Sequence, residues 1–436
     1  MVVEALPDGW QNVKLSDLGE INRGRSRHRP RYAEHLYGGP YPFIQTGDIK
    51  NSGGRITHYQ QTYSEAGLAQ SRLWPSGTLC ITIAANIAET AILTFPACFP
   101  DSVVGFVADQ SKCDVRFVEY SFRYLKRKIQ HEASGSVQDN INLQTLEKLR
   151  LLLPPLPEQR AIASILGALD DKIELNRQMN RTLEAVAQAL FKSWFVDFDP
   201  VWAKKEGRQP FGMDADTASL FPDEFEESEL GLIPAGWRVV PLGEEFNITM
   251  GQSPPGNTYN EVGQGIPFYQ GCRDFMFRYP LRRVYCTAPT RFARDGDTLV
   301  SVRAPVGNIN MAIEPCAIGR GLAAVRHKGD GRSYTYLSMT FLKDFFAIFE
   351  SHGTVFGSLS KKDFQGPSVC APATEVINRF EQIVEPIDSQ IENNELETLT
   401  LAALRDTLLP KLLSGELRVP TATESVLSQE VTLHDA

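Results

Sequence analysis

Two runs of basic side chains offer the clearest chemistry in this sequence. Their members are Arg23, Arg25, Arg27, His28, Arg29 and Arg31 in one run, and Arg116, Arg123, Lys126, Arg127, Lys128 and His131 in the other. Clustered cations of this kind attract the phosphates of nucleic acids. In the first run the arginines occupy every second position, which is typical of a basic arm that orders on a polyanion. The sequence therefore predicts a local basic face.

An acidic protein is not expected to bind nucleic acids, so the distribution of charge along the chain has to be examined. The chain carries a net charge of −9. Residues 197–232 contribute 3 − 10 = −7 of it, because Lys204, Lys205 and Arg208 stand against ten acidic residues. Those ten are Asp197, Asp199, Glu206, Asp214, Asp216, Asp223, Glu224, Glu226, Glu227 and Glu229. Most of the acidity lies in one segment, so a basic face elsewhere is compatible with the acidic total.

Motifs that carry catalysis are missing from the sequence. It contains no G-x-x-x-x-G-K-[ST] loop, no G-x-G-x-x-G opening a βαβ unit, no G-x-S-x-G elbow and no H-E-x-x-H helix. Ser253-Pro254-Pro255-Gly256 partly resembles the Asn/Asp-Pro-Pro-aromatic motif of amino-methyltransferases. Gly256 stands where that chemistry needs an aromatic ring, so we interpret the segment as a turn. We expect no catalytic residues, and no metal or cofactor bound by this chain.

Cysteine usage and hydropathy predict where the protein works. The seven cysteines are scattered without zinc-ligand spacing, which favours a reducing compartment. The first ten residues lack a charged stretch followed by an apolar one. No apolar run reaches the roughly 18 residues that a membrane span requires. We expect a cytoplasmic protein that is not inserted in a membrane.

The sequence contains an internal repeat. LPDGWQNVKLSDLGEINRGRS, which begins at Leu6, is matched by IPAGWRVVPLGEEFNITMGQS, which begins at Ile233. Residues Pro7, Gly9, Trp10, Gly24, Ser26 and Gln45 recur as Pro234, Gly236, Trp237, Gly251, Ser253 and Gln270. The offset drifts from 227 to 218 along the chain, as expected if surface loops differ in length while the core persists.

Each copy ends in a long stretch with a heptad pattern, and here the offset is constant. One seam is Ile162, Leu169, Asn176, Leu183 and Leu190, repeated 218 residues later as Phe380, Ile387, Asn394, Leu401 and Leu408. A second seam, Leu166, Ile173, Asn180, Ala187 and Trp194, lies four residues after the first. Such helices either cover their own domain or pair as a coiled coil, and two equivalent narrow seams favour pairing. Asn176 and Asn394 lie at the seam centres, where buried amides fix register, and we predict a hydrogen bond between them.

The region before each helix has the pattern of mixed α/β structure. Short β-branched segments at 78–84, 103–108, 298–304 and 322–327 are bounded by Gly, Pro or Asp and predict strands. Residues 115–130 and 333–349 carry apolar side chains at spacings of three and four, which predict one helix in each copy. In the acidic segment and just before it, Phe191, Trp194, Phe195, Phe198 and Trp202 either dock on a partner or pack within the protein, and we favour packing within the protein.

An ordered set of motifs resembles a known family. A Leu/Ile-Pro-x-Gly-Trp entry begins each copy, and Gly135-Ser136-Val137-Gln138-Asp139-Asn140-Ile141 lies upstream of the first helix. The helix itself opens with Leu153-Pro154-Pro155-Leu156-Pro157-Glu158-Gln159-Arg160. This set resembles the specificity subunits of type I restriction-modification systems from Leu6 to about Val419. The second copy departs from it at 353–360 and 371–375.

The resemblance implies a fold and a division of the chain. The fold class is α/β (mixed α+β), with two target recognition domains in tandem, each followed by a long helix, and the helices pairing as an antiparallel coiled coil. The implied parts are recognition domain 1 (1–153), spacer helix 1 (154–196), an acidic linker (197–232), recognition domain 2 (233–371), spacer helix 2 (372–416) and a flexible tail (417–436).

The resemblance also implies a function and partners. A noncatalytic subunit of this family binds double-stranded DNA and reads a bipartite target, one half with each recognition domain. It directs two methyltransferase subunits and the restriction or motor subunits to that target. S-adenosylmethionine, ATP and Mg are then expected on the partner subunits.

Candidate contact residues follow from base and phosphate chemistry. Arg pairs with guanine and Asn or Gln with adenine, while other cations contact phosphates. We select Arg23, Arg25, Arg27, Gln45, Asp48, Gln138 and Asn140 in the first domain, and Gln252, Gln270, Arg273, Arg303, Lys361 and Lys362 in the second. Two other functions stay open, namely a fused methyltransferase-nuclease and a coiled-coil adaptor without DNA readout. Binding of S-adenosylmethionine or ATP by the isolated chain would indicate the former, and absence of sequence preference the latter.

Overall fold

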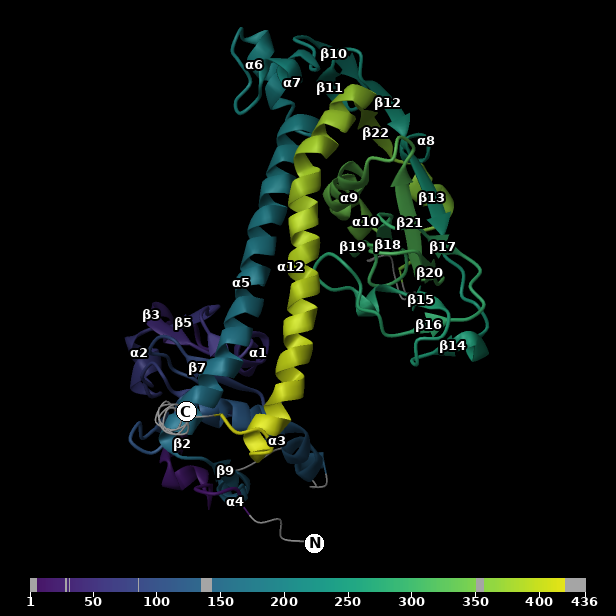
Figure 1. The fold of residues 1–436 in the computed structure, drawn as a ribbon. Helices are drawn as coiled ribbons and strands as arrows, with labels where there is room; N and C mark the ends of the chain where they lie inside the picture. Colours follow the sequence, from purple (N-terminus) through teal and green to yellow (C-terminus); the bar gives the residue numbers. More distant parts are fainter. Residues whose placement is uncertain are drawn as a thin grey trace, which may run out of the picture. The chain divides into compact units, whose positions relative to one another are not determined.

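The computed structural model of the chain describes residues 6–27, 30, 32–84, 86–134, 143–349 and 357–419. It divides into two compact units, of which unit 1 comprises Met1–Ile173 and Thr400–Ala436 and unit 2 comprises Glu174–Leu399. Two long helices, α5 (Leu156–Phe195) and α12 (Thr374–Ser414), contribute residues to both units (Figure 1). The predicted architecture, two globular α/β halves in tandem with a long helix after each, is the one observed.

Unit 1 is built on a five-stranded sheet with the order β2-β8-β6-β7-β4. Its strands are β2 (Gly19–Arg23), β4 (Arg55–Ile56), β6 (Leu79–Thr82), β7 (Thr90–Leu93) and β8 (Val103–Ala108). All neighbours run antiparallel except β4, which is parallel to β7. Helix α3 (Val115–Ser134) packs against β7 and places Phe117 and Phe122 in one core with Ile81 and Phe106. The strands predicted at 78–84 and 103–108 and the helix predicted at 115–130 are therefore confirmed.

Smaller elements complete unit 1. Antiparallel pairs join β1 (Gln11–Val13) to β9 (Leu151–Leu153) and β3 (Tyr37–Phe43) to β5 (Gln61–Tyr63). The short helices are η1 (Leu15–Asp17), η2 (Glu34–Leu36), α1 (Thr46–Asn51), α2 (Glu65–Ala69) and α4 (Leu143–Lys148).

Unit 2 contains two larger sheets. The first has the order β13-β21-β18-β19, formed by β13 (Phe246–Met250), β18 (Thr298–Ser301), β19 (Ile309–Met311) and β21 (Leu322–His327). The second has the order β14-β16-β15-β20-β17, formed by β14 (Tyr259–Asn260), β15 (Ile266–Tyr269), β16 (Tyr285–Cys286), β17 (Phe292–Ala293) and β20 (Cys316–Ile318). Strands β18 and β21 confirm the predictions at 298–304 and 322–327.

The helices of unit 2 lie against the first of these sheets. Helix α9 (Arg332–Phe341) packs on β18, β19 and β21 (Figure 1). The single helix predicted at 333–349 is divided at Leu342 into α9 and α10 (Lys343–Ala347). The remaining elements are β12 (Arg238–Pro241) paired with β22 (Ser368–Ala371), α8 (Leu242–Glu245), η3 (Gly256–Thr258), η4 (Cys272–Asp274) and α11 (Lys361–Gln365).

The internal repeat is visible in the strand pairing. The order β2-β8-β6-β7 in unit 1 corresponds to β13-β21-β18-β19 in unit 2, and β1-β9 corresponds to β12-β22. The registers agree as well, because Arg23 lies opposite Val104 and Met250 lies opposite Ala323. Arg23 and Met250 are 227 positions apart, and Val104 and Ala323 are 219 positions apart. The other residue pairs of these strands are related by the same two offsets. The repeat found in the sequence is therefore a structural repeat.

The long helices run antiparallel in each unit. In unit 2, Asn176 Nδ2 donates to Asn394 O at 3.4 Å, and Asn394 Nδ2 donates to Asn180 Oδ1 at 2.8 Å. Asn180 Nδ2 donates to the carbonyl of Ile391. Residues later in α5 therefore contact residues earlier in α12, as in an antiparallel pair. In unit 1, Asp170 on α5 accepts Arg405 Nη1 of α12 at 2.7 Å. The predicted bond between Asn176 and Asn394 is confirmed, while supercoiling of the pair stays a prediction.

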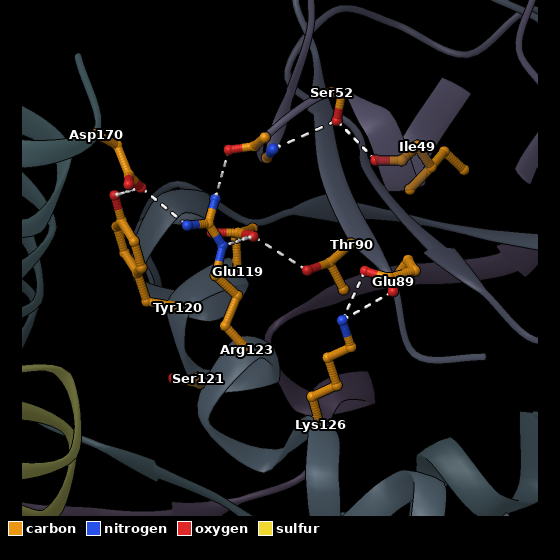
Figure 2. A network of polar contacts seen from close by, with 12 residues as sticks. Ile49, Ser52, Glu89, Thr90, Glu119, Tyr120, Ser121, Arg123, Lys126 and Asp170 are labelled. Atoms are coloured by element: carbon orange, nitrogen blue, oxygen red, sulfur yellow. Dashed lines mark hydrogen bonds and ion pairs between the residues drawn. The ribbon is translucent and has the colours of Figure 1, made fainter. Parts of the chain in front are cut away.

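Asp170, which lies on α5, pairs with an arginine from each of two other helices in unit 1. These are Arg123 of α3 (Figure 2) and Arg405 of α12. Arg123 Nη1 donates to Asp170 Oδ2 at 2.9 Å, and Arg123 also pairs with Glu119 on its own helix. Tyr120 Oη donates to the same Asp170 oxygen at 2.8 Å. Burial alone would raise the pKa of Asp170, but the attraction of Arg123 and the hydrogen bonds from Arg405 and Tyr120 outweigh it and lower the pKa. Asp170 is therefore held as a carboxylate.

Asp388 takes the equivalent position in unit 2, 218 residues after Asp170. Arg278 Nη1 donates to Asp388 Oδ1 at 2.8 Å, and Ser333 Oγ of α9 donates to Asp388 Oδ2 at 2.6 Å. Arg278 also pairs with Glu184 of α5, and its side chain is only 1% exposed. Each globular half is thus joined to its own long helix through an aspartate at the same position of the repeat.

The acidic segment and the tail contain more structure than their composition predicts. Residues 197–232 form α6 (Asp199–Lys205), α7 (Ala215–Ser219), β10 (Phe225–Ser228) and the first half of β11 (Gly231–Pro234). Phe191, Trp194 and Phe195 lie in the core of unit 2, which confirms packing within the protein, whereas Trp202 stays 38% exposed. After α12, Arg418 pairs with Glu158 at 2.7 Å, so the predicted flexible tail begins with an anchored residue. Residues 420–436 lie outside the described part.

Candidate nucleic-acid interface

The predicted contact residues of unit 1 gather where β2 ends. Arg23 is the last residue of β2, and Arg23, Arg25 and Arg27 are exposed while Gly24 and Ser26 between them are buried. The Arg25 N–H donates to Phe99 O at 3.1 Å, and Ser71 Oγ donates to Arg25 O at 2.8 Å. Because the segment alternates, the three guanidinium groups lie on one side of it.

Gln45 lies beside the same segment. Its neighbour Ile44 donates its N–H to Cys98 O at 2.9 Å, so Arg25 and Gln45 flank residues 98–99. The amide of Gln45 donates to Gln61 Oε1 at 2.6 Å. Asp48 accepts the Gln45 N–H at 2.8 Å and caps α1, which gives this predicted contact residue a structural role. We call Arg23, Arg25, Arg27 and Gln45 surface 1.

In unit 2 the segment 318–321 gathers the polar residues. The Gln252 N–H donates to Ile318 O at 3.0 Å, and the Gly321 N–H donates to Gln270 O at 3.1 Å. Val302, next to Arg303, donates its N–H to Gly321 O at 2.9 Å. The side chains of Gln252, Gln270 and Arg303 are exposed. Three predicted residues from three parts of the sequence therefore meet along one short segment.

Gln270 is held in place by its neighbours. Its Nε2 donates to Ser253 Oγ at 2.7 Å, and Ser253 Oγ lies 3.1 Å from Gln270 Oε1. A Cβ added to Gly319 would lie 2.6 Å from Gln270 Oε1, so only glycine leaves room for this side chain. The amide of Gln270 is thus preset before any ligand arrives.

Two exposed arginines beside residues 318–321 were not among the residues selected from the sequence. The Arg291 carbonyl accepts the Ile318 N–H at 3.0 Å, and the Arg320 N–H donates to Ser253 Oγ at 3.3 Å. Neither guanidinium forms an ion pair within the part of the chain that the structure describes. The glycines that flank Arg320 were the available signal, because they mark close backbone approach. We call Gln252, Gln270, Arg291, Arg303 and Arg320 surface 2.

Within the described residues, Arg273, Lys361 and Lys362 form no side-chain hydrogen bond or ion pair with surface 1 or surface 2. Arg273 lies in η4, and Lys361 and Lys362 begin α11; all three are exposed. Gln138 and Asn140 lie outside the described residues. Contact with DNA by each residue selected from the sequence stays a prediction.

Three of the six residues in the second basic run are paired with carboxylates. Arg116 pairs with Asp114, Arg123 with Glu119 and Asp170, and Lys126 with Glu89. Figure 2 shows Arg123 and Lys126 turned toward these carboxylates. The expectation of a nucleic-acid face here is wrong for these three residues, because carboxylates neutralise them, Asp114 and Glu119 from nearby positions and Glu89 and Asp170 from distant ones.

Surfaces 1 and 2 occupy equivalent positions of the repeat. The Gly24 N–H bonds Val103 O at 2.8 Å and the Gly251 N–H bonds Leu322 O at 2.9 Å. The Arg25–Phe99 bond corresponds to the Gln252–Ile318 bond. Parallel bridges also correspond, joining Phe43 to Cys98 and Phe268 to Ala317. One backbone frame thus carries arginine in unit 1 and glutamine in unit 2 at the same place.

This arrangement suits recognition better than catalysis. Exposed arginines and amides can bond phosphates and base edges. In the described residues, no three His, Cys, Asp or Glu side chains are placed to hold a metal ion. None of the described helices is long and apolar enough to cross a membrane.

Comparison with known proteins gives the same class. Residues 7–185 match the family described as the type I restriction modification DNA specificity domain. The putative type I restriction enzyme MjaX specificity subunit of Methanocaldococcus jannaschii is 31% identical over 431 residues, a match that covers 95% of each chain. The MjaIX specificity subunit of the same organism is 26% identical over 442 residues, again covering 95% of each. The crystal structure of an S subunit from M. genitalium shares the fold, with a TM-score of 0.59, 17% identity and coverage of 94% of this chain and 98% of that one.

Two globular units that carry equivalent polar surfaces with different side chains define a tandem recognition protein. The full-length match at 31% identity then fixes the family. The chain belongs to the specificity subunits of type I restriction-modification systems.

Proposed function

We propose that this chain is the noncatalytic subunit that reads a bipartite duplex DNA target, one part with each unit. Surface 1 would contact one half-site and surface 2 the other. The observation that carries the proposal is the repeated backbone frame, which presents different side chains at equivalent positions. Identical frames with different side chains suit two readers of different sequences.

The proposal includes the rest of the complex. Two methyltransferase subunits would methylate adenine within the target, and restriction or motor subunits would join them. S-adenosylmethionine, ATP and Mg would be bound by those partners and not by this chain. The complex would work in the cytoplasm.

The test is to express this subunit with its methyltransferase partner and to sequence the methylated adenines of the host genome. We expect one motif in two parts, separated by bases that are not read. A continuous motif would contradict the assignment of one half-site to each unit. Calorimetry of the isolated chain with S-adenosylmethionine and with ATP should give no binding, and binding of either would favour a fused enzyme.

A further inference from the structure

Arg25 and Gln252 occupy equivalent positions in the two copies of the repeat, and both have exposed side chains. Each donates its backbone N–H to a carbonyl of a neighbouring segment, Arg25 to Phe99, which precedes β8, and Gln252 to Ile318, the last residue of β20. Each comes directly after a buried or half-buried glycine, Gly24 or Gly251, whose N–H is bonded in the same manner. Both side chains are exposed, and neither makes a side-chain hydrogen bond within the described residues.

The glutamines beside them differ in this respect. Gln45 is bonded to Gln61, and Gln270 is bonded to Ser253, so both amides are already engaged. Gln45 and Gln270 are also the same residue type in both units. They cannot by themselves make two halves read different bases. Position 25/252 differs between the units and is free to form new bonds.

The two side chains have different base partners. The arginine fork matches the O6 and N7 acceptors of guanine, whereas the glutamine amide matches the N6 donor and N7 acceptor of adenine. A swap at one fixed backbone position would therefore change the base that is bonded while leaving the docking frame unaltered.

We propose that Arg25 and Gln252 are matched specificity-determining residues, Arg25 for a guanine in one half-site and Gln252 for an adenine in the other. This inference rests on the proposed function and names the residue in each unit that sets the base. The repeat makes the prediction reciprocal, because each residue can be tested in its counterpart's place.

The test uses the complex of the full chain with its methyltransferase partner. Its methylated motif is determined first, and binding is then measured on duplexes that carry all four bases at each motif position. For Arg25→Gln we expect the preference for one guanine in one half-site to fall about 5- to 150-fold, with adenine gaining. For Gln252→Arg we expect the reverse change in the other half-site. Neither variant should alter the half-site read by the other unit.

Matched controls separate base readout from charge and from folding. Arg238→Gln makes the same chemical change on β12, and Gln209→Arg makes the reciprocal change on the acidic segment; both residues are exposed and should leave base preference unchanged. Arg25→Lys keeps the charge but lacks the planar fork, so it should weaken the guanine preference less than Arg25→Gln does and keep the salt dependence of binding. Thermal unfolding of each variant checks that the fold is retained.

Two results would overturn the assignment. One is an unchanged base preference in folded Arg25→Gln and Gln252→Arg complexes that still bind a split motif, and this result leaves the proposed function intact. The other is an equal loss of affinity for every sequence, which indicates a phosphate contact. A wild-type complex that methylates a continuous sequence would contradict the proposed function and this inference together.

Discussion

Asp170 keeps its charge at a site where burial disfavours it. Its side chain is 15% exposed and accepts bonds from Arg123, Arg405 and Tyr120. The two arginines favour the carboxylate, and its pKa in the folded chain lies below the ordinary value. An acid with a lowered folded pKa stabilises the fold above its unfolded pKa of about 3.9, and this stabilisation is lost as pH falls toward the folded value.

Asp170→Asn should therefore lower the free energy of unfolding by about 3 kcal/mol at pH 7, since it removes the buried carboxylate that Arg123 and Arg405 share. The difference from wild type should stay constant down to about pH 5 and shrink below about pH 4. Urea unfolding across this pH range measures both effects. Asp171→Asn is the matched control, because Asp171 is 58% exposed and its pair with Arg55 should contribute less than about 1 kcal/mol. An equal loss in both variants would contradict the role of Asp170.

The buried amides of the helix pair give a second prediction for single residues. Asn394 is 2% exposed and donates to Asn180 across the pair. Asn394→Ala leaves a buried acceptor on Asn180 without its donor, which should cost about 1–3 kcal/mol of stability in urea unfolding. Asn393→Ala changes the exposed neighbour and should have almost no effect. Similar midpoints for the two variants would show that the amide pair does not stabilise the helices.

At the scale of elements, the residues that directly follow β2 and β13 must be glycine, because the chain passes close to another backbone segment there. A Cβ on Gly251 would lie 2.2 Å from the carbonyl oxygen of Gly319, and one on Gly24 would lie 2.3 Å from that of Pro100. Both neighbours are backbone, which cannot move aside without shifting the recognition surface. The same constraint in both units explains why these glycines recur in the repeat.

Gly251→Ala should lower the stability of the chain by about 1–3 kcal/mol through this clash. It should also weaken reading of the half-site contacted by surface 2 and leave the other half-site unaffected. Unfolding and base preference in the methyltransferase complex measure the two effects. Gly271→Ala is the control, because a Cβ there meets nothing within 4 Å. A loss of both half-sites together would contradict the assignment of one half-site to each unit.

Local patterns predicted the elements better than the contacts between them. The repeat, the strands at β6, β8, β18 and β21 and both long helices follow from periodicities within short windows. The bond between Arg278 and Asp388 joins residues 110 positions apart, and nothing local in the sequence selects that partner. Arg123 looked like part of a basic face for the same reason, since its neutralising Asp170 is 47 positions away. Residues selected by type, such as Arg25 and Gln252, could be found, but their equivalence required the backbone bonds.

At the scale of the whole molecule, the two long helices are the elements that both units share. Residues 156–173 of α5 belong to unit 1 and residues 174–195 to unit 2, while α12 divides between Leu399 and Thr400. The division of α5 lies between Asp170, which pairs with Arg405 in unit 1, and Asn176, which bonds Asn394 in unit 2, and the division of α12 lies between Asn394 and Arg405. We expect that lengthening both helices at these divisions retains the contacts within each unit, because the added residues fall outside the residue ranges that each unit comprises.

Duplicating residues 167–173 and 393–399 together should lengthen the spacer of the DNA motif. Seven residues add about 10 Å of helix and turn the seam by only about 20°, so the pairing can continue. DNA rises about 34 Å in 10 base pairs, so we expect about three more unread base pairs between the half-sites. Sequencing of methylated adenines measures the spacer. Duplicating 167–173 alone shifts Asn176 against Asn394 and should destabilise the chain instead. A folded double duplication with an unchanged spacer would show that the helices do not set the distance between half-sites.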